Sequence, residues 1–165
     1  MAKKDPMPEL LRHWREAVPD DRLAHLIRDV ARAQMRALQL RLAEHGVSFG
    51  HWTFLRILWL KDGLTQRELS ELAGVMEPTT FAAVKAMQDM GLVERKQLPG
   101  NRKNMHVFLT RAGRNLEKKL VPLAEEVNRI SVAGQSDHQV SQTRKFLLQM
   151  LENLAKDWAQ GKDSD

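Results

Sequence analysis

A single stretch decides the fold: Gly74–Thr110, which reads GVMEPTTFAAVKAMQDMGLVERKQLPGNRKNMHVFLT. Its first half predicts a helix that begins near Pro78, because proline suits a first helical position, and that ends at Gly91. Its second half predicts two strands, over 92–96 and 105–109. Between them lies Pro99-Gly100-Asn101, a sequence that favours a tight turn. The stretch therefore combines one helix with a short hairpin.

A shorter helix precedes this stretch and supplies the first half of a two-helix motif. Thr65 and Glu68 have the spacing of a capping box, which marks a helix start. Leu69, Leu72 and Ala73 are expected to form the buried face of this helix before a glycine ends it. Two short helices joined by a tight turn predict a helix-turn-helix, and the hairpin that follows it is a wing.

The second helix of the motif is expected to have one buried side and one exposed side. The spacing i, i+3, i+4, i+7 places four residues inward: Thr80, Ala83, Val84 and Met87. Six residues are left outward: Thr79, Phe81, Ala82, Lys85, Ala86 and Asp89. Apolar groups on an exposed helix face are unfavourable in water. In a DNA major groove they fit against thymine methyl groups, so this helix is predicted to enter that groove.

Five residues of this helix are predicted to contact DNA: Pro78, Thr79, Phe81, Ala82 and Lys85. The Thr79 hydroxyl can donate to a base edge or accept from it. The start of the helix offers the positive end of its dipole to a phosphate. The alternative for Phe81 is that its ring covers the core from the flank of the helix.

A run of basic residues extends through and beyond the wing. From Arg95 to Lys119 the chain carries eight basic residues and one acidic residue. Phosphate contacts fix the register of a protein on DNA and supply much of its affinity. Four wing residues are therefore predicted to contact DNA: Arg95, Asn101, Arg102 and Lys103. The alternatives are a solvated charged face for the run and a role in holding the turn for Asn101.

Helical segments surround the winged motif. Ser48 is expected to cap a central helix, and Pro122 is expected to break or kink the helix that follows Thr110. The outer segments carry apolar stripes too wide for two isolated helices, which predicts contact with each other and with a second chain. The predicted organisation is an N-terminal arm (1–19), a helical dimerisation region (20–45 and 111–159), a winged helix-turn-helix region (46–110) and a disordered tail (160–165).

Composition narrows the class of protein. The 165 residues include 26 basic and 21 acidic side chains, a net charge of +5 and a mild preference for polyanions. No cysteine is present, which excludes disulfides and cysteine-ligated zinc. The sequence has no apolar run that could span a membrane, no catalytic motif and no metal-ligand spacing among its six histidines. We expect a cytoplasmic protein that is no enzyme and has no cofactor.

Four sequence blocks together resemble the MarR (multiple antibiotic resistance regulator) family of bacterial transcription regulators. The blocks are GVSFGHWTFL (46–55), LTQRELSELAGV (64–75), MQDMGLVERK (87–96) and NRKNMHVFLTRAG (101–113). The last block is the telling one, because it closes on the family's Leu-Thr-x-x-Gly. The resemblance implies a mainly α fold with a small β-wing. It also implies a homodimer on a near-palindromic operator of double-stranded DNA, with repression as the commoner mode of regulation.

Four positions depart from the family pattern. Asn101 replaces the usual wing aspartate, Lys103 replaces the second wing arginine, and His51 replaces the usual glutamine. Ala82 stands where the recognition helix commonly has arginine. The loss of that arginine predicts fewer guanine contacts and more readout of shape and methyl groups.

Family members often bind small aromatic acids or phenols, and the resemblance implies a similar effector that releases DNA. The candidate effector-binding residues are Arg41, His45, His51, Trp52 and Arg56. Arg56 is expected to be buried among aromatic residues, where a guanidinium requires a partner. That partner is either a protein carboxylate or the carboxylate of the effector. A different class remains open, a winged-helix adaptor that binds proteins and has no affinity for DNA.

Overall fold

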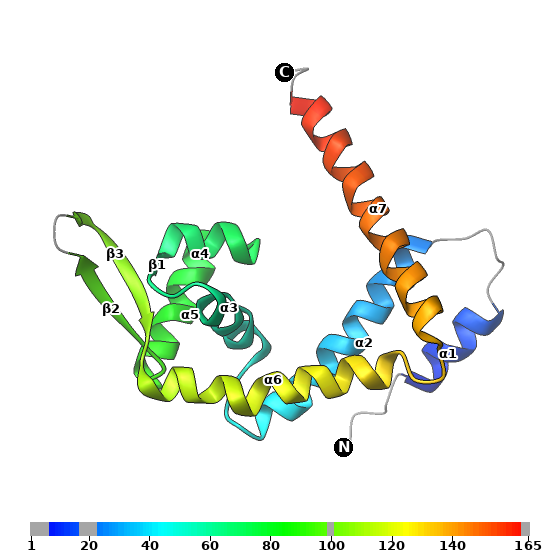
Figure 1. Cartoon of the computed structure of the whole chain (residues 1–165), viewed down its shortest axis with the longest axis horizontal. Helices are drawn as coiled ribbons and strands as arrows, with labels where there is room; N and C mark the ends of the chain where they lie inside the picture. Colours follow the sequence, from blue (N-terminus) through cyan, green and yellow to red (C-terminus); the bar gives the residue numbers. More distant parts are fainter. Residues whose placement is uncertain (1–6, 17–22, 99–100, 163–165) are drawn as a thin grey trace. The chain divides into compact units, whose positions relative to one another are not determined.

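The computed structural model describes residues 7–16, 23–98 and 101–162. The fold is mainly helical with one small sheet, as the sequence predicts (Figure 1). In chain order the elements are α1 (Met7–Glu16), α2 (Leu23–Ala43), α3 (Phe49–Leu60), β1 (Leu64–Thr65), α4 (Gln66–Ala73), α5 (Glu77–Asp89), β2 (Val93–Leu98), β3 (Asn101–Leu109), α6 (Arg111–Ser131) and α7 (Asp137–Lys162). No helix in the described ranges combines the length and the apolar character needed to cross a membrane.

The chain divides into two compact units, Met1–Val127 and Asn128–Asp165. The first unit contains the hydrophobic core, to which α2, α3, α4, α5, the sheet and α6 contribute. Its most deeply buried side chains include Leu42, Leu55, Leu58, Leu64, Leu69, Val84, Met87, Val107 and Leu120. The second unit consists of the end of α6 and α7, and no described residue of α7 is buried.

The sheet has three antiparallel strands in the order β1-β3-β2. β2 and β3 form a hairpin that extends away from α3, α4 and α5, which is the predicted wing (Figure 1). Both strands are longer than predicted. β1 was not predicted, because two residues carry no alternation pattern. It exists through pairing of Leu64 with Val107 and of Thr65 with His106.

The helix-turn-helix forms as predicted at its start and differs on one face. The Thr65 hydroxyl accepts from the Glu68 amide at 3.2 Å while the Glu68 carboxylate accepts from the Thr65 amide at 2.8 Å, a complete capping box. The prediction that Leu72 is buried is wrong, since 61% of it is exposed. Ser70 is buried in its place, because it lies beside Leu69 on the side of α4 that faces α5.

Two further boundaries differ from the predictions. α6 continues through Pro122, so the proline does not break the helix; it removes one backbone donor, and packing of α6 on the core holds the remaining turns. α7 continues to Lys162, so residues 160–162 of the predicted tail are helical, and 163–165 lie outside the described residues. The predicted arm contains α1, a helix of ten residues.

The first turn of α6 packs against the base of the wing at very short range. A Cβ atom on Gly113 would lie 2.1 Å from the carbonyl oxygen of Leu92. That oxygen already accepts from the backbone amide of Thr110 at 3.0 Å, so it is held in place. The indole nitrogen of Trp59 donates to the Gly113 carbonyl at 3.0 Å. Gly113 therefore lets α6, α3 and the start of the wing meet.

We expect Gly113→Ala to lower the free energy of unfolding by about 1–3 kcal/mol, because the new methyl group overlaps a carbonyl that cannot move aside. Chemical denaturation measures the effect. Gly50→Ala is the matched control, since a Cβ there meets nothing closer than the Ser48 hydroxyl at 3.8 Å. This control is expected to be neutral or stabilising by about 0.5–1 kcal/mol. Equal stability of both variants would contradict the packing described here.

Candidate nucleic-acid interface

The buried side of α5 follows the predicted register. Thr80, Val84 and Met87 are fully buried and Ala83 is half-buried. α5 begins at Glu77, with Met76 as an N-cap that makes no side-chain hydrogen bond. Pro78 is therefore the second helical residue rather than the first. The register turns the opposite side of α5 away from the core.

A buried hydroxyl pair sets how α4 and α5 meet. The Ser70 hydroxyl donates to the Thr80 hydroxyl oxygen at 2.8 Å, and both residues are almost fully buried. The same Ser70 oxygen is 2.8 Å from the Gln66 carbonyl. Buried polar groups are stable where they find partners, so this pair favours one arrangement of the two helices. Sequence reasoning placed Thr80 inward and did not find its partner.

The outer side of α5 exposes the residues that were predicted to meet DNA. Pro78, Thr79, Ala82 and Lys85 are exposed, and Ala86 is half-buried. Phe81 exposes 51% of its surface. The exposed fraction of Phe81 disfavours the alternative in which its ring covers the core. α5 thus presents apolar, hydroxyl and cationic groups together on an exposed face.

Arg95 extends from β2 to the flank of α5. Its Nε atom donates to the Gln88 side-chain oxygen at 2.7 Å. Its guanidinium carbon lies 5.8 Å from the centroid of the Phe81 ring, within the range of a cation–π contact. The DNA contact predicted for Arg95 would thus involve a side chain that already has two partners within the protein. Sequence reasoning missed Gln88, whose role depends on a strand seven residues further along the chain.

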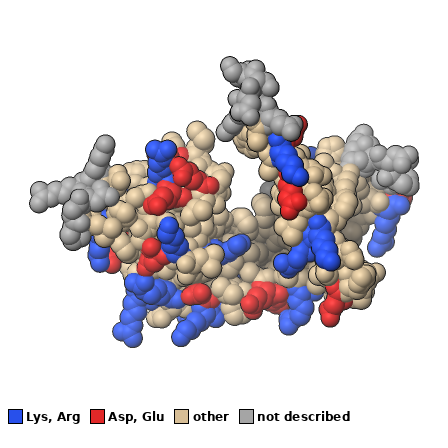
Figure 2. Space-filling model, turned by 45° about the horizontal axis from the view of Figure 1, so that its top comes forward, with Lys and Arg blue, Asp and Glu red and all other residues tan. Residues whose placement is uncertain are grey.

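The end of the wing is described only in part. The backbone of Asn101, Arg102 and Lys103 begins β3, and Leu98 pairs with Asn101 after an irregularity in register. The side chains of these three residues, and residues 99–100 of the predicted turn, lie outside the described part of the chain. Their DNA contacts therefore stay predictions. Figure 2 shows Lys and Arg mixed with Asp and Glu on the face in view, without one large basic area.

Asp62 joins the end of α3 to the base of the wing and to α6. One oxygen of its carboxylate accepts from the backbone amides of Leu109 at 2.8 Å and of Gly63 at 3.0 Å. The other oxygen accepts from Arg114 at 2.6 Å. Arg114 belongs to the basic run, so at least one member of that run has a structural partner. Sequence reasoning assigned no role to Asp62.

The candidate effector-binding residues fall into two groups. Trp52 is buried and meets Trp59 edge to face, with ring centroids 5.6 Å apart. Arg41 is bound to a protein carboxylate, since its Nε donates to Glu126 at 3.2 Å. His51 is half-buried, and burial lowers the pKa of its ring, which favours the uncharged form at neutral pH. Arg41 of α2 thus supplies a cationic group, and His51 and Trp52 of α3 supply an uncharged polar group and an aromatic group.

Two of the effector candidates lie elsewhere than expected. Arg56 is exposed, so the prediction of a buried guanidinium among aromatic rings is wrong. Trp52 is buried and Phe49 and Trp59 are half-buried, whereas the Arg56 side chain lies at the surface. His45 is also exposed, because α2 ends at Ala43 and His45 stands in the turn before Gly46. His45 therefore does not lie on the apolar face of α2.

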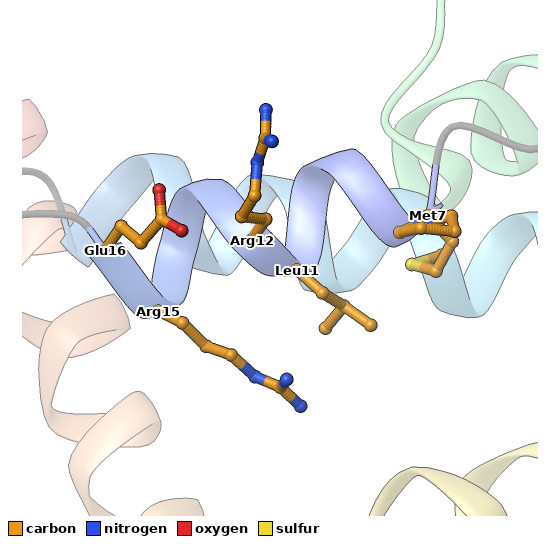
Figure 3. Close-up of a pocket in the computed structure, with 6 residues that line it drawn as sticks. Met7, Leu11, Arg12, Arg15 and Glu16 are labelled. Atoms are coloured by element: carbon orange, nitrogen blue, oxygen red, sulfur yellow. The ribbon is translucent and has the colours of Figure 1, made fainter.

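A shallow hollow lies on α1, away from all the predicted site residues. The residues that line it belong to α1 alone: Met7, Pro8, Leu11, Arg12, Arg15 and Glu16. Figure 3 shows Arg12 on one side of the helix and Leu11 and Arg15 on the other, so the three do not converge on one point. α1 is held to α2 by the Trp14 indole nitrogen, which donates to Asp29 at 3.2 Å. The hollow has no arrangement that suggests a ligand.

These elements define a winged helix-turn-helix protein, with an exposed second helix beside a β-hairpin. Residues 47–105 match the model of the MarR family. The chain is 26% identical to the HTH-type transcriptional regulator TtmR of Methylorubrum extorquens, over 82% of this chain and 65% of that relative. The chain therefore spans about two thirds of the length of TtmR.

Solved structures agree with this assignment. A MarR transcriptional regulator from Methanosarcina mazei Go1 is 28% identical, with a TM-score of 0.74 over 81% of this chain and 96% of its own. A MarR-family regulator from Listeria monocytogenes, solved with a 26mer DNA, shares the fold at 23% identity and a TM-score of 0.75, over 88% and 97% of the chains. The chain is thus similar to the MarR family in sequence over residues 47–105 and in fold over most of its length. Its relatives are transcriptional regulators and not enzymes.

Proposed function

We propose that this chain is a transcriptional regulator that binds double-stranded DNA in a sequence-dependent way. The observation that carries the proposal is the exposed face of α5 beside the wing. Thr79, Ala82 and Lys85 lie there in the open, although an apolar and hydroxyl-bearing helix face has little reason to be exposed unless something docks on it. The Listeria relative with the same fold holds a 26mer DNA, which supports a duplex as that partner.

The roles of the residues follow from their chemistry. Thr79, Ala82 and Phe81 would read base edges and thymine methyl groups, while Lys85 and the wing residues Arg102 and Lys103 would contact phosphates. Because Ala82 stands where the family commonly has arginine, the preference for particular DNA sequences would come from contacts with thymine methyl groups and from DNA shape. A protein-binding adaptor is the competing class. It differs in that its binding would not weaken steeply as salt displaces condensed counterions.

The working form is proposed to be a homodimer. α7 exposes a row of large apolar side chains: Phe146, Leu147, Leu148, Leu151, Leu154 and Trp158. α2 adds Leu23, Val30, Met35 and Leu40, each exposed by more than 40%. Exposed apolar surface on this scale marks a protein interface. A two-fold pair would place two copies of α5 about 34 Å apart, one turn of DNA, on a near-palindromic operator.

Regulation is proposed to be repression that a small aromatic acid relieves. Trp52 is buried and directly follows the half-buried His51 in α3. The ring of His51 is uncharged at neutral pH, and Arg41 supplies a cation that Glu126 holds. An incoming carboxylate would compete with Glu126 for that guanidinium. Because Glu126 belongs to α6 and Arg41 to α2, such a competition would alter how these helices meet. A coupling of about 1–3 kcal/mol between effector and DNA suffices for a switch.

The DNA assignment is tested on genomic fragments that the purified protein retains, with affinity measured against salt. Arg102→Ala is expected to weaken binding to operator and random duplex alike and to reduce the salt slope by about 1, because one phosphate contact is lost. Thr79→Ala is expected to lose about 1–3 kcal/mol of preference at particular base pairs. Lys156→Ala, at an exposed cation of α7, is the control and should change neither quantity. Binding that does not respond to salt would favour the adaptor.

The dimer is tested by a charge on the exposed row of α7. Leu151→Glu is expected to raise the dimer dissociation constant at least about 100-fold, since it buries a carboxylate without a partner. Sedimentation velocity over a range of protein concentrations measures the shift. Leu60→Glu is the matched control, because Leu60 is 86% exposed on α3 outside the predicted interface. A wild-type protein that remains monomeric at high concentration would contradict the proposed form.

The effector is tested by a screen of aromatic carboxylic acids. An active compound is expected to raise the melting temperature and to weaken operator binding about 5- to 150-fold. Arg41→Gln should abolish the response and keep operator binding, because it removes the cation and leaves α5 unchanged. Arg36→Gln on the exposed side of α2 serves as the control. If no compound changes melting or DNA affinity, the effector proposal fails and the DNA proposal stands.

A further inference from the structure

The flank of α5 that faces the wing carries a three-residue contact. Phe81 and Gln88 are seven residues apart, which places them on the same side of the helix two turns from each other. Arg95 of β2 reaches both, with its Nε 2.7 Å from the Gln88 oxygen and its guanidinium 5.8 Å from the Phe81 ring centroid. The arginine thus lies along the helix and bridges two turns of it.

This arrangement differs from that of a cation which waits for a phosphate. Arg95 is half-buried, whereas its neighbour Lys96 is exposed. The Nε donor of Arg95 is already used, and its guanidinium carbon lies over an aromatic ring. A lysine in its place could keep the charge, but it lacks the planar fork that makes these two contacts at once.

We propose that Arg95 and Gln88 are positioning residues for DNA binding. They hold the base of the wing against α5 and fix the position of the Phe81 ring. The helix and the hairpin then meet the duplex as one surface. The inference rests on the proposed function, because it concerns how the DNA-binding surface is assembled. It differs from the sequence-based prediction, in which Arg95 contacts a phosphate directly.

Salt dependence separates the two roles. Loss of a phosphate contact reduces the slope of log affinity against log salt by about 0.9. Loss of a positioning contact weakens binding because the surface must be ordered on binding, and the number of neutralised phosphates stays the same. Gln88 carries no charge, so any effect of its removal on DNA affinity has to come through Arg95 or the α5 surface.

The experiment measures operator affinity at several salt concentrations for Gln88→Ala, Arg95→Lys, Arg95→Ala and the double variant Gln88→Ala/Arg95→Ala. Each single variant is expected to weaken operator binding about 3- to 10-fold with an unchanged salt slope. The double variant is expected to be no weaker than Arg95→Ala, because both residues act through one contact. Arg102→Ala provides the reference for a reduced slope, and melting temperatures verify that each variant is folded.

Two results would overturn the positioning role. One is that Arg95→Lys binds like the wild type while Arg95→Ala loses about 0.9 of the slope, which is the behaviour of a phosphate contact. The other is that Gln88→Ala has no effect on affinity. In both cases the wild-type protein still binds the operator, so the proposed function stands. Failure of the wild-type protein to bind duplex DNA even at low salt would instead remove the proposed function, and the positioning role with it.

Discussion

The close approach of α6 to the base of the wing is the constraint on which the rest of the structure depends. Gly113 has no side chain, and the Leu92 carbonyl occupies the place where a Cβ would stand. Thr110 reinforces the contact, because its hydroxyl donates to the Gly91 carbonyl at 2.7 Å and accepts from the Gly113 amide at 3.1 Å. The end of α5, the start of β2 and the start of α6 are thereby fixed to one another. The orientation of the wing relative to α5 follows from this junction.

Much of the helical part could be predicted because its signals are local. Thr65 caps α4 and Ser48 caps α3, where its hydroxyl accepts from the His51 amide at 3.1 Å. The buried register of α5 followed from the spacing of Thr80, Val84 and Met87, since helical periodicity needs no knowledge of the partner. Each of these features is settled within about one or two turns of chain.

The features that escaped prediction depend on residues far apart in sequence. β1 exists because β3 pairs with it, and Ser70 is buried because Thr80 lies opposite. In the candidate site, the exposed face of α5 could be predicted from the sequence, whereas the contact of Arg95 with Gln88 could not. A helical wheel gives the side of a helix, but it does not show which strand will lie along it. The same limit explains Arg56, whose aromatic neighbours in sequence turn inward without it.

None of the side chains described for α7 is buried, and this links the stability of the helix to the concentration of the protein. A helix of 26 residues whose described apolar side chains are mostly exposed would gain most of its stability from whatever molecule lies against it. Where that molecule is a second copy, association and folding of this segment obey mass action. A scarce protein would then hold more of this helix frayed and open to proteases than an abundant one. Cellular abundance would in this way act on the lifetime of the chain as well as on the occupancy of its target.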